Sequence, residues 1–403
     1  MPNIKPLKKI VSKARGLKDR HSERHRPSGF GFALADSVDY LDGERWDALT
    51  RNDSVFLSRR YLRVLEETGP ANLRQRYALI FRGSQAVAAV AGQCVTLSVA
   101  QTQKESKHKK ISATLEHLEE RMLVCGNLLS WGMHGVSFAP DEDPAELWPA
   151  VAEALYRIRR ADKLYGDTDL VMVKDITDKE APAASTLSRF SYRPLETDPN
   201  MVLEISPSWK SYEDYLAGLN SKYRKTAKQI DKEALAAGCI VEELKDVGKH
   251  AETLHGLYMQ VHSNARFRPV TLKPEFIPTL AERLGEDLRC TILRRGDEII
   301  GFVTTVRDGE TAVGYYIGFD RKASADCPIY LRLLQAVVPD ALKLGCRRLS
   351  LGRTALEPKA RIGAKPQPMR VYIRHRVPML NVLVRGLLHT ISHDEAPERN
   401  PFK

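Results

Sequence analysis

The chain has 403 residues, of which 43% are hydrophobic and 28% charged, and its formal net charge is +11. This balance is that of a folded globular protein. It excludes a membrane-embedded one, because no apolar run approaches the ~20 residues of a spanning helix. The length exceeds what one hydrophobic core usually organises, so two domains are expected. The positive charge favours a polyanionic partner: nucleic acid, an anionic membrane surface or a phosphate-bearing substrate.

The chain begins with a strongly basic segment. Residues 1–30 hold nine Lys or Arg against two acids, and apolar residues recur within residues 4–17 at three- and four-residue spacing. An amphipathic helix of this kind would lie on an anionic bilayer, where apolar burial and charge attraction act together. A disordered basic tail is the alternative, because Pro6 and Gly16 both weaken a helix. A nucleic-acid arm is disfavoured, because no aromatic residues lie between the cations for stacking on bases.

This segment has no apolar signal-peptide core, so a cytoplasmic location is expected, peripheral at the inner membrane if the basic segment binds there. The six cysteines form no C-x-x-C pair. Their scatter argues against a zinc site and a disulfide framework and fits a reducing compartment. We therefore expect no metal site.

Two stretches of similar pattern follow. Residues 73–99 and 288–320 each read as strands joined by tight turns, with Gly83 and Gly296 supplying the positive φ that such turns require. Each stretch leads into a helix-length segment and a further strand. We therefore expect two α/β units of one plan. The expected divisions are a basic tail at 1–30, a first unit at 31–205, a second unit at 206–380 and a C-terminal tail at 381–403.

The second half contains, in order and separated by helices, "SKYRKTAKQIDKEALAAGCIVEE", "CTILRRGDEIIGFVTTVRDGETAVGYYIGFD" and "RRLSLGRTALEPKARIGA". This order resembles the Fem-type (FemAB-like) branch of the GNAT acyltransferase superfamily, most strongly over residues 210–376. The resemblance implies an α/β (α+β) fold of two tandem GNAT-like domains with mixed central sheets, the second being catalytic. It also implies an amide-forming enzyme that transfers an acyl group from an activated carrier to an amine, with no permanently bound cofactor.

That reaction needs a polarised carbonyl and an amine that has lost a proton. In a GNAT-like fold, backbone N–H groups of a splayed strand polarise the carbonyl, and residues 313–320 are the corresponding strand. Tyr315 and Tyr316 are expected to face opposite sides of the sheet, one the cleft and the other the core. Asp320 could accept a proton or cap the next turn.

The next loop departs from the family. Residues 321–334 lack the Gly-rich turn whose amides cradle a pyrophosphate in acetyl-coenzyme A enzymes. Three donors therefore stay open: an acyl-CoA held through fewer contacts, an acyl carrier protein and an aminoacyl-tRNA. A carrier protein is acidic, which suits a basic surface.

Residues 351–376 hold seven Lys or Arg and one acid. They follow a short apolar run that is predicted to be a strand, and they are rich in Gly and Pro. They are either a solvated basic loop or the wall of an anion-binding cleft, since α/β folds bind ligands at the carboxyl ends of strands. Residues 261–271 are expected to border the same cleft. The predicted catalytic residues are His262, Tyr316, Asp320 and His375, and the predicted substrate-binding residues are Arg266, Tyr315, Arg353, Lys359, Lys365 and Tyr372.

The acceptor amine has three interpretations. The first is a lipid amine at the membrane surface, such as a sphingoid base, which would make the protein ceramide synthase-like. The second is a peptidoglycan precursor, extended by aminoacyl transfer from tRNA. The third is a non-catalytic scaffold with this fold. The chain has no coiled-coil insertion of the kind that tRNA-using Fem enzymes often carry, which favours a thioester donor. The apolar segment 377–391 is expected to pack on the second unit, to lie in the membrane interface or to line an acyl channel.

Overall fold

The computed structural model describes residues 26–98, 119–265, 268–377, 379–381, 397 and 399–403. Most of the basic N-terminal segment, most of segment 377–391 and Arg266 lie outside these residues, so the roles predicted for them stay predictions. None of the described helices is long and apolar enough to cross a membrane.

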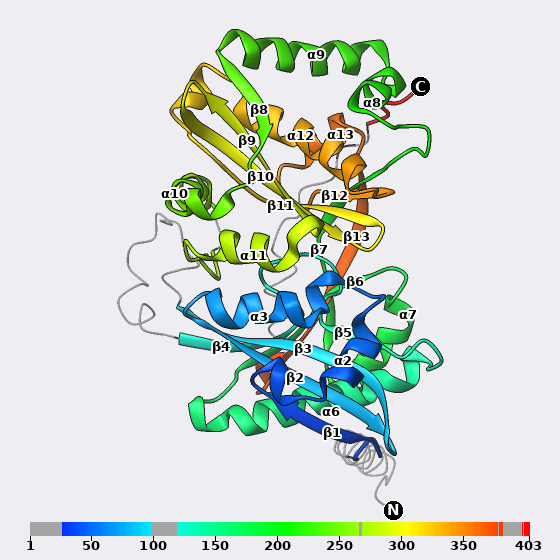
Figure 1. The fold of residues 1–403 in the computed structure, drawn as a ribbon. Coiled ribbons are helices and arrows are strands. Elements are labelled where there is room, and N and C mark those ends of the chain that lie inside the picture. The colour runs from blue at the N-terminus through cyan, green and yellow to red at the C-terminus, as the bar shows by residue number, and fades with distance from the viewer. Residues whose placement is uncertain (1–25, 99–118, 266–267, 378, 382–396, 398) are drawn as a thin grey trace, which may run out of the picture.

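The first unit runs through the lower half of Figure 1. Its main elements are β1 (Gly31–Ala35), α2 (Gly43–Thr50), α3 (Arg59–Thr68), β2 (Leu73–Arg82), β3 (Gln85–Ser98), β4 (Glu119–Cys125), β5 (Val136–Phe138), α6 (Pro144–Ala161), β6 (Leu170–Thr177), α7 (Ala181–Ala184) and β7 (Arg193–Glu204).

The second unit occupies the upper half, with α9 at its top. Its main elements are α8 (Tyr212–Gly218), α9 (Ser221–Ala236), β8 (Cys239–Glu243), α10 (Ala251–His262), α11 (Phe276–Leu284), β9 (Leu288–Arg295), β10 (Glu298–Asp308), β11 (Thr311–Phe319), α12 (Ile329–Lys343), β12 (Arg348–Ser350), α13 (Leu356–Arg361) and β13 (Lys365–His375).

The two units repeat one order of elements. Leaving aside the short β5, the run from β1 to β7 matches the run from β8 to β13: a strand, two helices, three strands, then helix, strand, helix and strand. The predicted turns are present, because Gly83 and Gly296 adopt positive φ values of 61° and 58° in the hairpins β2–β3 and β9–β10. The repeat predicted from the two meanders is therefore confirmed in the order of the elements.

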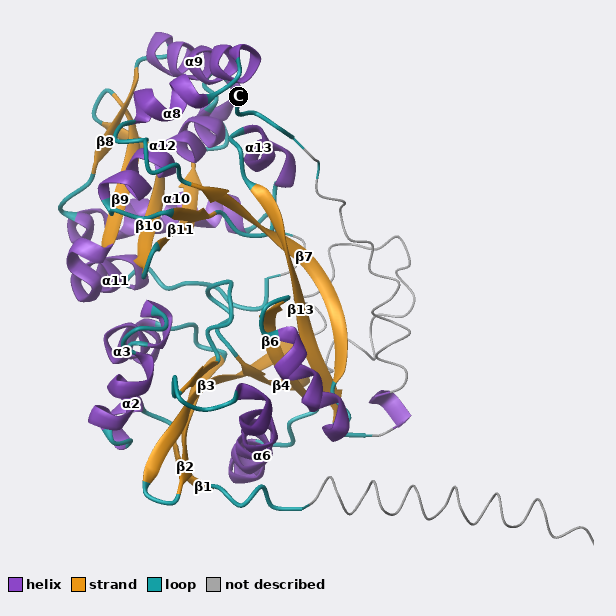
Figure 2. Cartoon of the chain, turned by 90° about the vertical axis from the view of Figure 1, so that its right-hand side faces the viewer, coloured by secondary structure: helices purple, strands orange, loops and turns teal. Residues whose placement is uncertain are grey.

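All the strands within the described residues belong to one sheet of 13 strands, in the order β1-β2-β3-β4-β6-β13-β7-β12-β11-β10-β9-β8, with β5 paired to β3. The last strands of the two units are exchanged. β7 pairs with β12 of the second unit, and β13 pairs with β6 of the first. These two long strands run side by side through the middle of the molecule in Figure 2. The mixed α/β fold is confirmed, but its two expected sheets are fused by this exchange.

Three apolar clusters fill the space around this sheet. One is built mainly from the first unit, around α6, with Tyr372 of β13 added from the second, and one mainly from the second, around α12. The third is shared, because Phe56, Tyr61 and Tyr77 of the first unit pack in the same cluster as Phe276 and Tyr315 of the second. This shared cluster brings α3 against α11 at the waist of the molecule. The boundary predicted at 205/206 remains a prediction, and the sheet is continuous across it.

Both units interrupt their fourth strand at the same register. In the first unit, β4 and β5 lie in line along β3, with the last pair of one at Gly92↔Cys125 and the first pair of the other at Val90↔Val136. Residues 126–135 leave the sheet between them. In the second unit, β11 is interrupted between the pairs Thr305↔Gly314 and Val303↔Ile317, so a two-residue bulge stands in the equivalent place.

Candidate active site

A cavity of about 420 Å³ lies where β11 and β12 separate. These strands pair in parallel over Thr311–Val313 and 348–350, after which β12 ends while β11 continues to Phe319. The cavity is lined by β11, the end of α10, one face of α12, residues 351–354 and Lys359 of α13. Residues after α10, from Ala265 to Leu272, also line it, as do Val303 of β10 and residues 128–131 of the first unit. The site is thus built by both units.

The bulge in β11 places two tyrosines on one side of the sheet. Thr304 stands alone opposite Tyr315 and Tyr316, and its Oγ1 accepts a hydrogen bond of 3.0 Å from the Tyr316 N–H. The two rings are 4.6 Å apart between centroids, and both line the cavity. The prediction that these side chains face opposite sides was therefore wrong, because a bulge suspends the alternation of a regular strand.

Both tyrosines are hydrogen-bonded to the first unit. The Tyr315 hydroxyl lies 2.7 Å from the Tyr61 hydroxyl, and Tyr316 donates to the carbonyl of Leu129 at 3.2 Å. Burial holds the pKa of both phenols well above the ordinary value. Each therefore stays protonated at neutral pH, and neither is suited to act as a base.

Lys359 brings an amine to the same cavity. Its side chain belongs to α13 and is 5% exposed, and none of the described residues makes a hydrogen bond or ion pair with its ammonium group. Burial lowers the pKa of Lys359 to about 7, since the charged form is desolvated without a compensating partner. A large fraction of this lysine is consequently neutral at physiological pH.

Arg353 lines the cavity but is already engaged. Its guanidinium binds the Asp175 carboxylate of the first unit at 2.9 Å. Asp175 is fully buried, with an unusual φ of 59°, and also contacts Lys174 and the Gly132 N–H. Burial alone would raise the pKa of Asp175, but Lys174 and Arg353 beside it hold the pKa below its usual value. Arg353 therefore joins the two units as well as facing the cavity.

His262 ends α10 at the rim of the cavity. Its ring stacks on Tyr258, with 4.9 Å between centroids, and its Nε2 lies 3.0 Å from the Thr271 hydroxyl. Burial and the nearby Arg268 lower the pKa of His262, so its imidazole is neutral at pH 7.

The structure thus brings five predicted residues together at the cavity: His262, Tyr315, Tyr316, Arg353 and Lys359. It does not bring Asp320 there. The Asp320 carboxylate accepts hydrogen bonds from the N–H groups of Lys322 at 2.7 Å and Ala323 at 3.2 Å, and so it caps the following turn.

Three further predicted residues, Lys365, Tyr372 and His375, are carried away from the cavity by the strand exchange. All three belong to β13, which extends along β6 into the first unit. Lys365 is exposed, Tyr372 is buried in the core around α6, and Nδ1 of His375 accepts from the Val377 N–H at 2.9 Å. The expectation that β13 returns past the cleft is corrected on this point.

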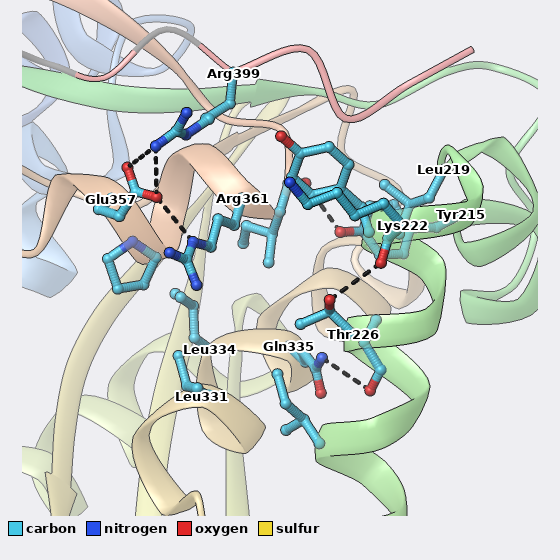
Figure 3. A pocket seen from close by; sticks show the side chains of 15 residues that line it. Tyr215, Leu219, Lys222, Thr226, Leu331, Leu334, Gln335, Glu357, Arg361 and Arg399 are labelled. Atoms are coloured by element: carbon cyan, nitrogen blue, oxygen red, sulfur yellow. Dashed lines mark hydrogen bonds and ion pairs between the residues drawn. The ribbon is translucent and has the colours of Figure 1, made fainter.

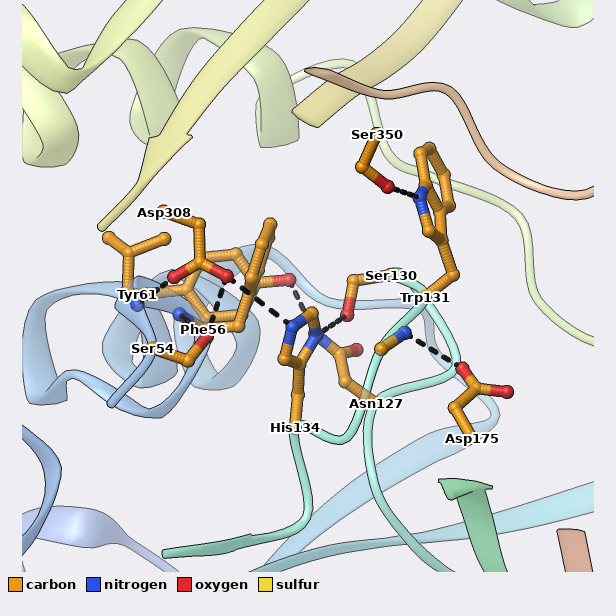
Figure 4. Close-up of polar contacts among 12 residues, drawn as sticks. Ser54, Phe56, Tyr61, Asn127, Ser130, Trp131, His134, Asp175, Asp308 and Ser350 are labelled. Carbon is orange, nitrogen blue, oxygen red and sulfur yellow. Dashed lines mark hydrogen bonds and ion pairs between the residues drawn. The ribbon is translucent and has the colours of Figure 1, made fainter. Parts of the chain in front are cut away.

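Sequence reasoning missed the contribution of the first unit. Figure 4 shows Asn127, Ser130, Trp131 and His134 in polar contact with neighbouring elements. Trp131 donates to the Ser350 hydroxyl at 2.8 Å, which ties residues 126–135 to the end of β12. The visible signal was the segment GNLLSWGMHG, whose three glycines and polar residues interrupt an otherwise apolar strand pattern.

A second pocket of about 260 Å³ lies between α9, α12 and α13 (Figure 3). Its floor is apolar, and Leu334 of α12 lines both this pocket and the cavity. Its rim carries Arg361 and Arg399, which share Glu357 as ion-pair partner, and Lys222 of α9. The two spaces therefore share one lining residue of α12.

Known proteins share this architecture. Residues 221–360 match the family model of the acetyltransferase (GNAT) domain. The second unit contains a GNAT acyltransferase domain. The cavity lies where the strands of this matched region separate.

A protein from Mycobacterium tuberculosis named "Putative 8-amino-7-oxononanoate synthase 2" is 25% identical to this chain over 288 residues. The match covers 69% of this chain and 36% of that protein, so the chain spans about a third of the relative's length.

Two solved structures share the fold over nearly their whole length. "Crystal structure of FemX" aligns with a TM-score of 0.52 and 10% identity, covering 85% of this chain and 98% of that one. A "Tandem GNAT protein from the clavulanic acid biosynthesis pathway" aligns with a TM-score of 0.50 and 10% identity, covering 87% and 99%. The tandem arrangement around the GNAT domain is therefore a known one.

Proposed function

We propose that this protein is an N-acyltransferase that moves an acyl group from a thioester donor to an amine, and that Lys359 is its general base. The observation that carries the proposal is a buried, unpartnered lysine in a largely apolar cavity at the point where β11 and β12 separate. An aliphatic amine with a pKa of about 10 is an ammonium ion at pH 7 and must lose a proton before it can attack. A base whose pKa lies near the working pH is well matched to remove it.

The chemistry can be assigned to atoms. Lys359 Nζ takes a proton from the acceptor ammonium, and the free amine attacks the acyl carbonyl carbon. The new C–N bond replaces the bond from that carbon to the donor, and the donor leaves as a thiol after receiving a proton. Beyond Val313 no strand of the described sheet pairs with the β12-facing edge of β11, so its N–H groups there are available to the developing oxyanion.

We propose a lipid amine, such as a sphingoid base, as the acceptor, which would make the protein ceramide synthase-like. Apolar side chains of Leu128, Leu129, Val261 and Val270 line much of the cavity, and they suit an aliphatic chain better than a sugar or peptide. The name of the mycobacterial relative also denotes an aliphatic molecule that carries an amine beside a ketone.

The donor, an acyl-CoA or an acyl carrier protein, is proposed to enter from the second pocket. That pocket has an apolar floor for an acyl or pantetheine arm and a cationic rim for a phosphate. Leu334 lines both this pocket and the cavity that holds Lys359. The basic segment at residues 1–30 would bring the enzyme to the cytoplasmic face of an anionic membrane, where lipid amines reside.

A Fem-type aminoacyl transferase is the second candidate, supported by the shared tandem fold with FemX over 98% of that chain. In that case the donor is an aminoacyl-tRNA and the acceptor a peptidoglycan precursor. The base assigned to Lys359 would be the same, because both reactions form an amide from an activated acyl group.

One assay separates the candidates. Purified protein is given palmitoyl-CoA with sphinganine, or an aminoacyl-tRNA with a peptidoglycan precursor, and amide products are measured by mass spectrometry. The proposal expects an N-acyl sphinganine and an equal amount of free CoA. An aminoacylated precursor in the second mixture alone would favour the Fem-type reaction, and no product in either would leave the scaffold interpretation.

A further inference from the structure

Residues 126–135 leave the sheet between β4 and β5 and bring a serine and a histidine to the second unit. Gly126 and Gly132 adopt positive φ values of 132° and 119°, which let this loop turn sharply. Ser130 on it lines the cavity. His134 lies behind Ser130, is 6% exposed and stacks on Phe56 at 4.4 Å between ring centroids.

These two side chains form a chain of contacts with an aspartate of the other unit. The Ser130 hydroxyl lies 2.7 Å from Nδ1 of His134, and Nε2 of His134 lies 3.6 Å from Oδ2 of Asp308. Asp308 also accepts from the Val55 N–H at 2.7 Å and from the Ser54 hydroxyl at 3.2 Å. Figure 4 shows the line of contacts from Asp308 through His134 to Ser130.

One assignment of protons lets these contacts activate the serine. In the neutral tautomer with its hydrogen on Nε2, that hydrogen faces the Asp308 carboxylate at an ion-pair distance of 3.6 Å. In a neutral imidazole, Nδ1 is then the acceptor, and the Ser130 O–H donates to it. This is the arrangement of an activated serine nucleophile with its base and an orienting acid, with the two ring nitrogens exchanged relative to the serine proteases.

We propose that Ser130 is an acyl-accepting nucleophile, with His134 as its base and Asp308 as a residue that positions His134. This inference rests on the proposed function and divides that reaction into two steps. Ser130 Oγ attacks the thioester carbonyl carbon, its proton passes to His134 Nδ1, and the C–S bond breaks. His134 then gives that proton to the leaving sulfur, which departs as a thiol.

The second step returns the enzyme to its starting form. The acceptor amine, deprotonated by Lys359, attacks the carbonyl carbon of the Ser130 ester. The C–O bond breaks, and Ser130 Oγ regains a proton from Lys359 through the cavity or through His134. The acceptor ammonium loses two protons on becoming an amide: one ends on Ser130 Oγ and the other is released to solvent, so no other reactant is consumed.

The test uses the full chain with palmitoyl-CoA and no amine. We expect a burst of free CoA equal to the enzyme concentration, an intact mass increased by one palmitoyl group, and the modified peptide mapped to Ser130. S130A should abolish both the burst and the adduct. H134Q should slow the burst at least 100-fold, and D308N should slow it with an unchanged KM for the donor.

Two controls keep the test interpretable. Ser137 follows the same loop, and its buried hydroxyl donates to the Leu49 carbonyl. The S137A variant removes this hydroxyl and should keep the full burst. S130C keeps a nucleophile at the position and should form a hydroxylamine-sensitive thioester adduct. Amide formation by wild type with no burst and no adduct would overturn this inference and leave the proposed function standing. If neither thiol nor amide forms with palmitoyl-CoA or a palmitoyl carrier protein, both are overturned.

Discussion

Both units interrupt their fourth strand at the equivalent position, but they do so in different ways. Opposite Ala91 the first unit opens its fourth strand into the loop 126–135, and opposite Thr304 the second unit opens its own into the bulge at Tyr315 and Tyr316. The first interruption sends a loop out of the sheet. The second keeps the strand whole and turns two phenols to one face.

A second difference follows at the neighbouring strand. In the first unit, β4 ends at Cys125, at the last of its parallel pairs with β6 (Cys125↔Val173), and β5 then covers β3. In the second unit, β11 continues well past its last pair with β12. One unit therefore closes its sheet and the other leaves an edge open. Two units of the same fold therefore have different roles in the site: the second forms most of the cavity, and the first forms one of its walls.

The largest expected effect lies on the open side of this comparison. Lys359→Met should lower amide formation by about 10²–10⁴-fold, which is the usual contribution of a general base. K365M is the matched control, because Lys365 is an exposed lysine of β13 outside the cavity lining. Full activity in K359M, measured by mass spectrometry of the product, would show that Lys359 is not the general base.

The same variant should be more stable than wild type below pH 7. The folded pKa of Lys359 is about 7, below the ordinary value of 10.5, so the unfolded chain binds more protons between these values. The free energy of unfolding of wild type should therefore rise as the pH increases from 7 to 10. Urea titrations at pH 6.5 and 9.5 should show a smaller rise in the free energy of unfolding for K359M than for wild type. An equal rise in the two proteins would contradict the burial of this amine.

The joint between the units should be the next most sensitive feature. Asp175→Asn removes the charge that compensates both Lys174 and Arg353, and breaking a buried pair in this way costs about 3–5 kcal/mol. D178N offers a control, because Asp178 is an exposed acid three residues further along the chain that pairs with Arg370. Chemical unfolding should separate the two variants, and equal stability would show that the Asp175 cluster is dispensable.

A smaller effect is expected at the bulge. Thr304→Val removes the hydroxyl that accepts the Tyr316 N–H while keeping the shape of the side chain. The loss should be about 1–3 kcal/mol, because a buried N–H loses its partner. T305V is the control, since Thr305 is equally buried but its hydroxyl contacts Asp340 at a longer 3.3 Å. A T304V protein as stable as wild type, by thermal and urea unfolding, would mean that this bond does not hold the bulge.

The smallest effect is expected where the strand exchange removed a predicted base. His375→Gln should leave kcat unchanged within about twofold, because His375 lies on β13 beside the first unit. H262Q makes the comparison informative, since His262 lines the cavity. Loss of kcat in H375Q together with normal activity in H262Q would contradict the placement of the active site.

Local sequence pattern predicted much of the fold and part of the site. Turn glycines and alternating strands marked both meanders, because those signals act between neighbouring residues. Lys359 and Arg353 were placed at the cleft because they follow a strand end. The exchange of β7 and β13 was not predictable in this way, since strand partners far apart in sequence leave no local mark.

Two further features were not predicted, because they too depend on residues far apart in the sequence. The bulge at Tyr315 and Tyr316 depends on the register of β10, which residue spacing along β11 does not reveal. Ser130 lines the cavity with His134 behind it, and Asp308 contacts His134 from 174 positions further along the chain. That the cavity belongs to both units could be seen only once the fold was known.

The pH dependence of kcat/KM for amide formation tests the central claim most directly. It should be measured for the amine, at saturating palmitoyl-CoA, on wild type and on K359R, whose arginine stays charged over the whole pH range of the assay. In wild type the rate should rise with pH and level off above an inflection near 7, where Lys359 loses its proton. The inflection should be absent in K359R, at a rate lower by about 10²-fold or more. The same inflection in K359R at an undiminished rate would contradict the assignment of Lys359 as the base.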